Sequence, residues 1–128
     1  MANRRDQAEH ESMVKSLVIH LKGQRHSNIG VDLFGGDIPD QVYWEKSNVG
    51  YIPDVTSIKN QPYIFEVETE DSINDPHTEE EWRLFYANSR QQKKSFIVVV
   101  PKGSEQLARQ RAESLGITLD DVWVVGNS

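Results

Sequence analysis

The chain lacks cysteine altogether, and it has no long apolar run. The absence of cysteine from its 128 residues excludes disulfide bonds, thiolate metal sites and a cysteine nucleophile, and it suits a reducing compartment. No apolar stretch is long enough to span a bilayer, and residues 1–11 contain no apolar core of a signal peptide. We therefore expect a cytoplasmic protein with no membrane partner.

Common motifs for nucleotide and zinc binding are missing as well. Neither G-x-x-x-x-G-K-[ST] nor a G-x-G-x-x-G that follows a strand occurs in the chain. The four histidines do not have the spacing of zinc ligands. These absences argue against a phosphate-binding loop and against a zinc site.

Acidic residues are in excess, and they are concentrated in one segment. The net charge of −6 argues mildly against a general nucleic-acid binder, because such binding depends on neutralising phosphates. Eight of the twenty Asp and Glu residues fall within 66–81, a segment that contains no Lys or Arg. Such a segment is either a solvated helix start or a site for a cation, and composition does not choose between the two.

Hydrophobic periodicity predicts one α/β domain that covers residues 1–128. Apolar residues spaced by three and four predict helices, whereas alternating or continuous short apolar runs predict strands. The helices are expected at 7–22, from 77–78 onward and at 105–115, and the strands at 28–34, 51–58, 63–69, 95–100 and 122–125. The order αβββαβαβ predicts a mixed sheet flanked by helices on both faces.

Three glutamates alternate along the predicted strand 63–69. Because strand side chains alternate with a period of two, Glu66, Glu68 and Glu70 should point to the same face. Three alternating glutamates by themselves are typical of the exposed face of an edge strand, since charged residues mostly lie in solvent. The surrounding sequence favours a site instead.

The turn between strands 51–58 and 63–69 determines which residue faces these glutamates. A three-residue turn pairs Ile58 with Pro62 and places Asp54 opposite Glu66, with their Cβ atoms about 4.5–5.5 Å apart. A two-residue turn would instead send Asp54 to the opposite face. Carboxylates held so close need solvent or a cation, and oxygen-rich sites suit Mg²⁺ or Mn²⁺ rather than zinc.

These residues resemble a known motif. Pro53 and Asp54, then eleven residues, then Glu66, Val67 and Glu68 on a hydrophobic strand are similar to the PD-(D/E)XK nuclease-like superfamily, in its E-x-E variant. The run EVETEDSINDPHTEEEW followed by FIVVVPKGSE is similar to small uncharacterised single-domain members. The resemblance implies a restriction-endonuclease-like core over about residues 7–125.

The resemblance also implies roles for particular residues. In the superfamily the Asp and the first acidic residue of the triplet bind the divalent metal, which implies that Asp54 and Glu66 bind Mg²⁺ or Mn²⁺ and that Glu68 takes the third role in the site. Many members carry a further acidic residue on the first helix, where Glu11 or Glu9 stands.

The chain departs from the superfamily's motif at the third position of the (D/E)XK triplet, which is normally Lys. Here it is Glu68, so another residue would have to supply the positive charge. Lys93 and Lys94 at the end of the second helix and Lys59 in the turn are candidates. His77 follows the acidic strand and could approach a metal or a phosphate, although helping to orient the helix start is its simpler role.

Two functions of different classes follow. The first is a divalent-metal-dependent DNA phosphodiesterase, a nuclease in which the metal polarises the phosphate and lowers the pKa of bound water. The second is a catalytically silent nuclease-fold domain that acts in binding or assembly, favoured by the missing lysine and the acidic net charge. Restriction-like folds often act as homodimers, but the sequence indicates no dimer surface.

Overall fold

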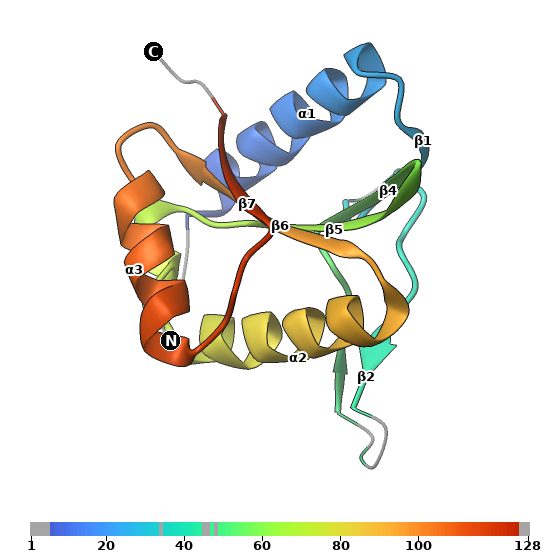
Figure 1. The fold of residues 1–128 in the computed structure, drawn as a ribbon. Coiled ribbons are helices and arrows are strands. Elements are labelled where there is room, and N and C mark those ends of the chain that lie inside the picture. Colours follow the sequence, from blue (N-terminus) through green and yellow to red (C-terminus); the bar gives the residue numbers. More distant parts are fainter. Residues whose placement is uncertain (1–5, 34, 45–46, 48, 126–128) are drawn as a thin grey trace.

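The protein combines a mixed sheet with helices on both of its faces (Figure 1). The computed structural model describes residues 6–33, 35–44, 47 and 49–125. Within this part of the chain there are three α-helices, a five-stranded sheet and a separate two-stranded hairpin. The elements are α1 Gln7–Gly23, β1 Ser27–Val31, β2 Val42–Tyr43, β3 Gly50–Tyr51, β4 Val55–Lys59, β5 Gln61–Val67, the 3₁₀ helix η1 Glu70–Ser72, α2 Pro76–Gln92, β6 Ser95–Pro101, α3 Glu105–Leu115 and β7 Asp121–Val125.

The five-stranded sheet has the order β1-β4-β5-β6-β7. Its first three strands are antiparallel, and β5, β6 and β7 are parallel. Parallel neighbours need a long crossover, which α2 and α3 provide. Strand β5 therefore lies at the centre, between β4 and β6, and has no open edge.

The two faces of the sheet are covered by different helices. Figure 1 shows α1 on one side of the sheet and α2 with α3 on the other. Along β5 the odd-numbered side chains Phe65 and Val67 pack against α1, and the even-numbered Ile64 packs on the side of α2. The alternation of a strand therefore fixes which helix each β5 residue meets.

Predicted strands are present with shifted bounds. The predicted strand 28–34 is observed as β1 Ser27–Val31, and Phe34, its predicted end, lies outside the described residues. The predicted strand 51–58 is divided, because Tyr51 belongs to the hairpin with β2 and β4 begins only at Val55. Pro53 stands between them and has no N–H to offer a ladder.

Helix α2 begins earlier than predicted. The expected start at His77 and Thr78 is wrong, because Asp75 is the N-cap and Pro76 is the first helical residue. The Asp75 carboxylate accepts a hydrogen bond from the His77 backbone N–H, and proline is well suited to a first helical position because its missing N–H is not needed there. Among the described residues no helix is both long and apolar enough to cross a membrane.

Close packing at β1 leads to a first prediction. A Cβ on Gly30 would lie 2.7 Å from Thr56 Oγ1 and 3.2 Å from the Asp37 carbonyl oxygen. We expect Gly30→Ala to lower the free energy of unfolding by about 1–3 kcal/mol, because the site has no room for a methyl group. Gly23→Ala is the matched control, since nothing lies within 4 Å of its added Cβ, and it should be neutral or slightly stabilising. Urea unfolding measures both, and equal losses for the two variants would contradict the prediction.

Candidate metal centre

The turn between β4 and β5 sets the pairing register of these two strands, and with it the position of the site residues. Ile58 pairs with Pro62 and Val55 with Phe65, as the three-residue turn predicts, and Asn60 takes a left-handed conformation with φ 67° at the tip. The same register carried one residue further places Asp54 beside Glu66. The Asp54 backbone N–H donates a hydrogen bond of 2.9 Å to Glu66 Oε2.

Three buried carboxylates meet between β5 and α2. Glu66 and Glu68 come from β5 and its C-terminal end, Glu81 comes from the second turn of α2, and one oxygen of each lies within 4.8 Å of the others. Their residues are 1%, 0% and 7% exposed. This acidic cluster, Glu66, Glu68 and Glu81, could hold a metal ion.

Both carboxyl oxygens of Glu68 accept hydrogen bonds. Ser72 Oγ donates to Glu68 Oε1 at 2.6 Å, and Trp82 Nε1 donates to Oε2 at 3.1 Å. The backbone N–H of Glu68 donates to the Val99 carbonyl, which extends the pairing of β5 with β6 by one residue. The Glu68 side chain is therefore fixed in place by the 3₁₀ helix on one side and by α2 on the other.

Burial and mutual repulsion disfavour the charged forms of these carboxyls. Burial first, and then the neighbouring Asp54, raise the pKa of Glu68 from 4.5 to about 8, although its hydrogen bonds from Ser72 and Trp82 act in the opposite direction. Burial followed by Asp54, Glu81 and Glu68 raises the pKa of Glu66 well above its ordinary range. Without a cation, Glu68 therefore retains its proton at neutral pH.

One side-chain oxygen of Glu66 could take a cation as its partner. Among the described residues, no group donates a hydrogen bond to the buried Glu66 Oε1. A buried carboxylate oxygen without a donor is costly, and a cation would satisfy it. A set of carboxylate oxygens is also the donor set that Mg²⁺ and Mn²⁺ prefer, so the residues present fit such an ion.

Asp54 lies behind the cluster and makes a second set of contacts. Its Oδ2 accepts a hydrogen bond of 2.8 Å from the Val67 backbone N–H and lies 3.3 Å from His10 Nε2. Both Asp54 and His10 are buried, at 6% and 3% exposure. Asp54 therefore joins the start of β4 to β5 and to α1. The third carboxylate of the cluster with Glu66 and Glu68 is that of Glu81.

Several predicted residues lie away from the cluster. Glu11 on α1 is exposed and Glu9 is only partly buried, so His10 is the buried residue of this turn. Glu70 does not share a strand face with the other glutamates, because β5 ends at Val67 and Glu70 lies in η1, in solvent.

Lys93 and Lys94 lie at the opposite end of α2 from His77. Lys93 is the C-cap of the helix and lies, with Lys94, about 18 Å along the helix axis from Glu81. Lys59 lies at the end of β4 that is remote from Asp54. His77 is close to the cluster, with Nε2 3.8 Å from Glu81 Oε2 and Nδ1 3.6 Å from Glu80 Oε2.

Sequence reasoning missed Glu81 and His10, although the signal was present. In α2 the buried residues Thr78, Glu81, Trp82, Phe85 and Ser89 follow one another at helical spacing, so the apolar stripe already includes position 81. From the sequence, position 81 is only the last residue of the acidic segment 66–81, which predicts either a solvated helix start or a cation site.

The same applies to α1, where the buried residues are His10, Met13, Val14, Leu17 and Leu21. Position 10 is therefore in phase with the stripe of the first helix, which had been judged only for zinc spacing.

Comparison with known proteins found no relative of this chain: no protein-family model, no curated protein and no solved structure matches it.

Proposed function

We propose that this chain is a divalent-metal-dependent DNA phosphodiesterase of the PD-(D/E)XK type. The observation that carries the proposal is the buried acidic cluster, in which Glu66 Oε1 has no hydrogen-bond donor among the described residues. The position of the cluster supports the proposal. Asp54 directly precedes β4, the Glu66-Val67-Glu68 triplet stands at the C-terminal end of the neighbouring strand β5, and both follow α1 and precede α2.

In this proposal, metal binding and proton transfer belong to different residues of the cluster. Glu66 and Glu81 would hold Mg²⁺ or Mn²⁺, with Asp54 adding negative charge behind them. When bound, the ion polarises a phosphate and lowers the pKa of a coordinated water. Glu68 would accept a proton from the attacking water, and Ser72 and Trp82 hold its two oxygens in a fixed direction.

A second candidate is a nuclease-fold domain that does not catalyse. Two observations favour it. The cluster is nearly closed to solvent, with Glu68 0% exposed, and the exposed residues nearest to it in the chain are acidic, including Glu70, Asp71 and Glu80. Such surroundings repel a phosphate backbone and favour a cation that stabilises the fold.

Metal binding and DNA hydrolysis test the two candidates together. We expect Mn²⁺ to bind the wild type in isothermal titration and to support cleavage of labelled single- and double-stranded DNA. Glu66→Gln should abolish the binding heat and reduce cleavage by about 100-fold or more, because it removes a ligand oxygen while keeping the volume of the side chain.

Glu70→Gln is the matched control, since Glu70 is exposed on the segment that follows the same strand. It should retain both the binding heat and the cleavage. Metal binding without cleavage of any DNA would establish the non-catalytic candidate. The absence of Mn²⁺ binding, with DNA present as well as without it, would overturn the metal centre itself.

A further inference from the structure

His77 is a partly exposed neighbour of the acidic cluster. The three cluster carboxylates, Glu66, Glu68 and Glu81, are buried, whereas the side chain of His77 is 43% exposed. His77 and Glu81 are four residues apart on α2, so their side chains lie on the same face of the helix, one turn apart. The imidazole of His77 therefore adjoins the cluster on the side of Glu81.

One nitrogen of the His77 ring is directed at a cluster carboxylate. Its Nε2 lies 3.8 Å from Glu81 Oε2, which is too long for a hydrogen bond. Two atoms that bind the same ion at about 2.0–2.2 Å each lie about 3–4 Å apart. The separation of Nε2 and Oε2 therefore suits two ligands of one metal ion.

The second nitrogen of the ring faces another carboxylate. His77 Nδ1 lies 3.6 Å from Glu80 Oε2, and the Tyr51 hydroxyl donates a hydrogen bond of 2.9 Å to the same oxygen. The Tyr51 ring meets the imidazole edge to face, with 5.1 Å between the ring centroids. Histidines that bind metal ions commonly turn their other ring nitrogen to a carboxylate, which fixes the orientation of the ring. Glu80 and Tyr51 therefore hold the ring with Nε2 towards Glu81.

The place of His77 in the helix favours a metal ligand over a surface ion pair. Asp75 is the N-cap of α2 and Pro76 its first residue, so His77 lies in the first turn, at the positive end of the helix macrodipole. A protonated imidazole is unfavourable at that end. A neutral imidazole instead keeps a lone pair on one ring nitrogen, which a metal ion can take.

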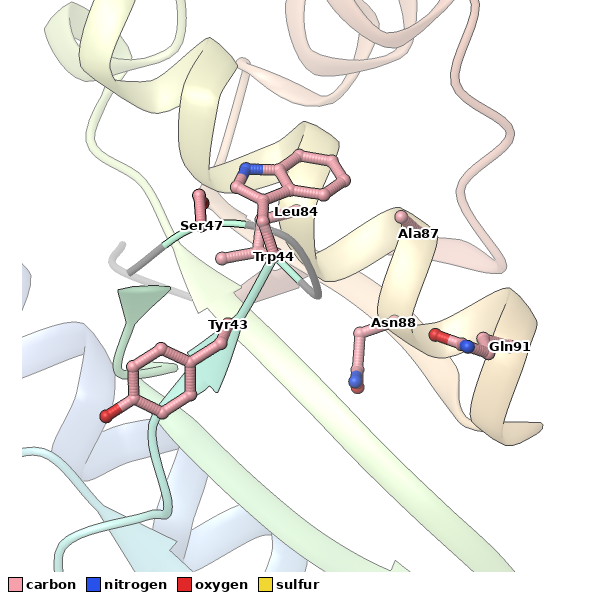
Figure 2. A pocket seen from close by; sticks show the side chains of 7 residues that line it. All are labelled: Tyr43, Trp44, Ser47, Leu84, Ala87, Asn88 and Gln91. Atoms are coloured by element: carbon pink, nitrogen blue, oxygen red, sulfur yellow. The ribbon is translucent and has the colours of Figure 1, made fainter. Parts of the chain in front are cut away.

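The pocket on the outer side of α2 offers no comparable ligands. It opens between the end of β2 and the C-terminal half of α2, and its lining residues are Tyr43, Trp44, Ser47, Leu84, Ala87, Asn88 and Gln91 (Figure 2). None of these lining residues carries a carboxylate or an imidazole. Along α2, a carboxylate and an imidazole meet instead in the first two turns, at Glu81 and His77.

We propose that His77 Nε2 is a nitrogen ligand of the ion that Glu66 and Glu81 hold, and that it makes the centre prefer transition-metal ions such as Mn²⁺ to Mg²⁺. This inference rests on the metal centre of the proposed function and adds the ligand that sets its selectivity. Mg²⁺ takes oxygen ligands and keeps several waters, whereas transition-metal ions also take imidazole nitrogen. A centre made of carboxylates alone would lack this source of preference.

Isothermal titration and pulsed electron paramagnetic resonance of the protein with Mn²⁺ test this ligand. An imidazole nitrogen bound to Mn²⁺ gives a nitrogen hyperfine coupling, which carboxylate and water ligands cannot give. We expect the wild type to bind Mn²⁺ about tenfold or more tightly than Mg²⁺ and to show this coupling. His77→Ala should weaken Mn²⁺ binding about tenfold, leave Mg²⁺ binding within about twofold of the wild type, and remove the coupling.

His20→Ala is the matched control, since His20 is an exposed histidine of α1 that lies beside Trp123 on the other face of the sheet. It should keep both the wild-type affinity for Mn²⁺ and the nitrogen coupling. Because the His77 side chain is partly exposed, His77→Ala should unfold in urea and EDTA at the same denaturant concentration as the wild type. A lost coupling then reports a lost ligand and not a lost fold.

The outcomes separate the role of His77 from the metal centre itself. Mn²⁺ binding without a nitrogen coupling in the wild type, equal affinities for Mn²⁺ and Mg²⁺, or an unchanged Mn²⁺ affinity and coupling in His77→Ala would overturn the role of His77 and leave the metal centre standing. No Mn²⁺ binding by the wild type, with DNA present as well as without it, would overturn the metal centre and this inference together.

Discussion

In metal-free protein, Glu68→Gln is expected to raise the free energy of unfolding by about 3–5 kcal/mol above pH 8 and to change it little below pH 4.5. The reason is the pKa of Glu68, which burial and the neighbouring Asp54 raise from 4.5 to about 8. Between these two values the folded protein holds a proton that the unfolded chain has released. Stability of the wild type therefore falls as pH rises through this window.

The amide introduced by Glu68→Gln would reproduce the protonated carboxyl. Its oxygen can accept from Trp82 Nε1, and its NH₂ group can donate to Ser72 Oγ, which lies 3.1 Å from the Thr69 carbonyl oxygen and can donate there instead. The variant keeps the hydrogen bonds and never ionises. Its stability should therefore show a flatter pH dependence than that of the wild type.

Urea unfolding in the presence of EDTA, repeated between pH 4.5 and pH 9, measures this difference. Glu70→Gln is the control, because it removes an acidic side chain that lies in solvent, and its pH dependence should follow the wild type. Parallel pH profiles for Glu68→Gln and the wild type would contradict the prediction, since they would show that Glu68 ionises in the folded protein as it does in the unfolded chain.

Asp54→Ala is expected to lower the free energy of unfolding by about 3–5 kcal/mol, the second large effect. The carboxylate of Asp54 accepts the Val67 backbone N–H and lies 3.3 Å from the buried His10 Nε2. Alanine would leave both groups buried beside a cavity. The loss combines an unsatisfied backbone donor with a buried imidazole that has lost its carboxylate.

Asp54→Asn separates shape from charge at the same position. Its amide oxygen can still accept the Val67 N–H, so we expect a loss of only about 1–2 kcal/mol. Urea unfolding at pH 7 in EDTA compares the two variants. A loss for Asp54→Ala as small as that for Asp54→Asn would show that Asp54 does not tie β4 to β5 and α1, and it would leave the residue with a role in the metal centre alone.

The sequence by itself determined the order of the elements and the position of two site residues on the central strand. Alternating and continuous apolar runs are local signals, so β5, β6, β7 and the three helices lie close to the predicted segments. The short turn fixed the register of β4 with β5, and with it the place of Asp54 opposite Glu66. The sequence had left a two-residue turn open as well, and the observed pairing of Ile58 with Pro62 decided for the three-residue turn.

Only the tertiary structure decided which groups complete the site. The alternating glutamates of EVETE are by themselves typical of an exposed edge strand. In the structure β6 pairs with β5, and α2 covers the face of Glu66 and Glu68, so these two are buried. Glu81 and His10 reach the site from helices, because packing of α2 and α1 on opposite faces of the sheet brings them there. Periodicity indicates that a residue faces inward, but the partner it meets depends on contacts between residues distant in sequence, and such contacts formed the acidic cluster.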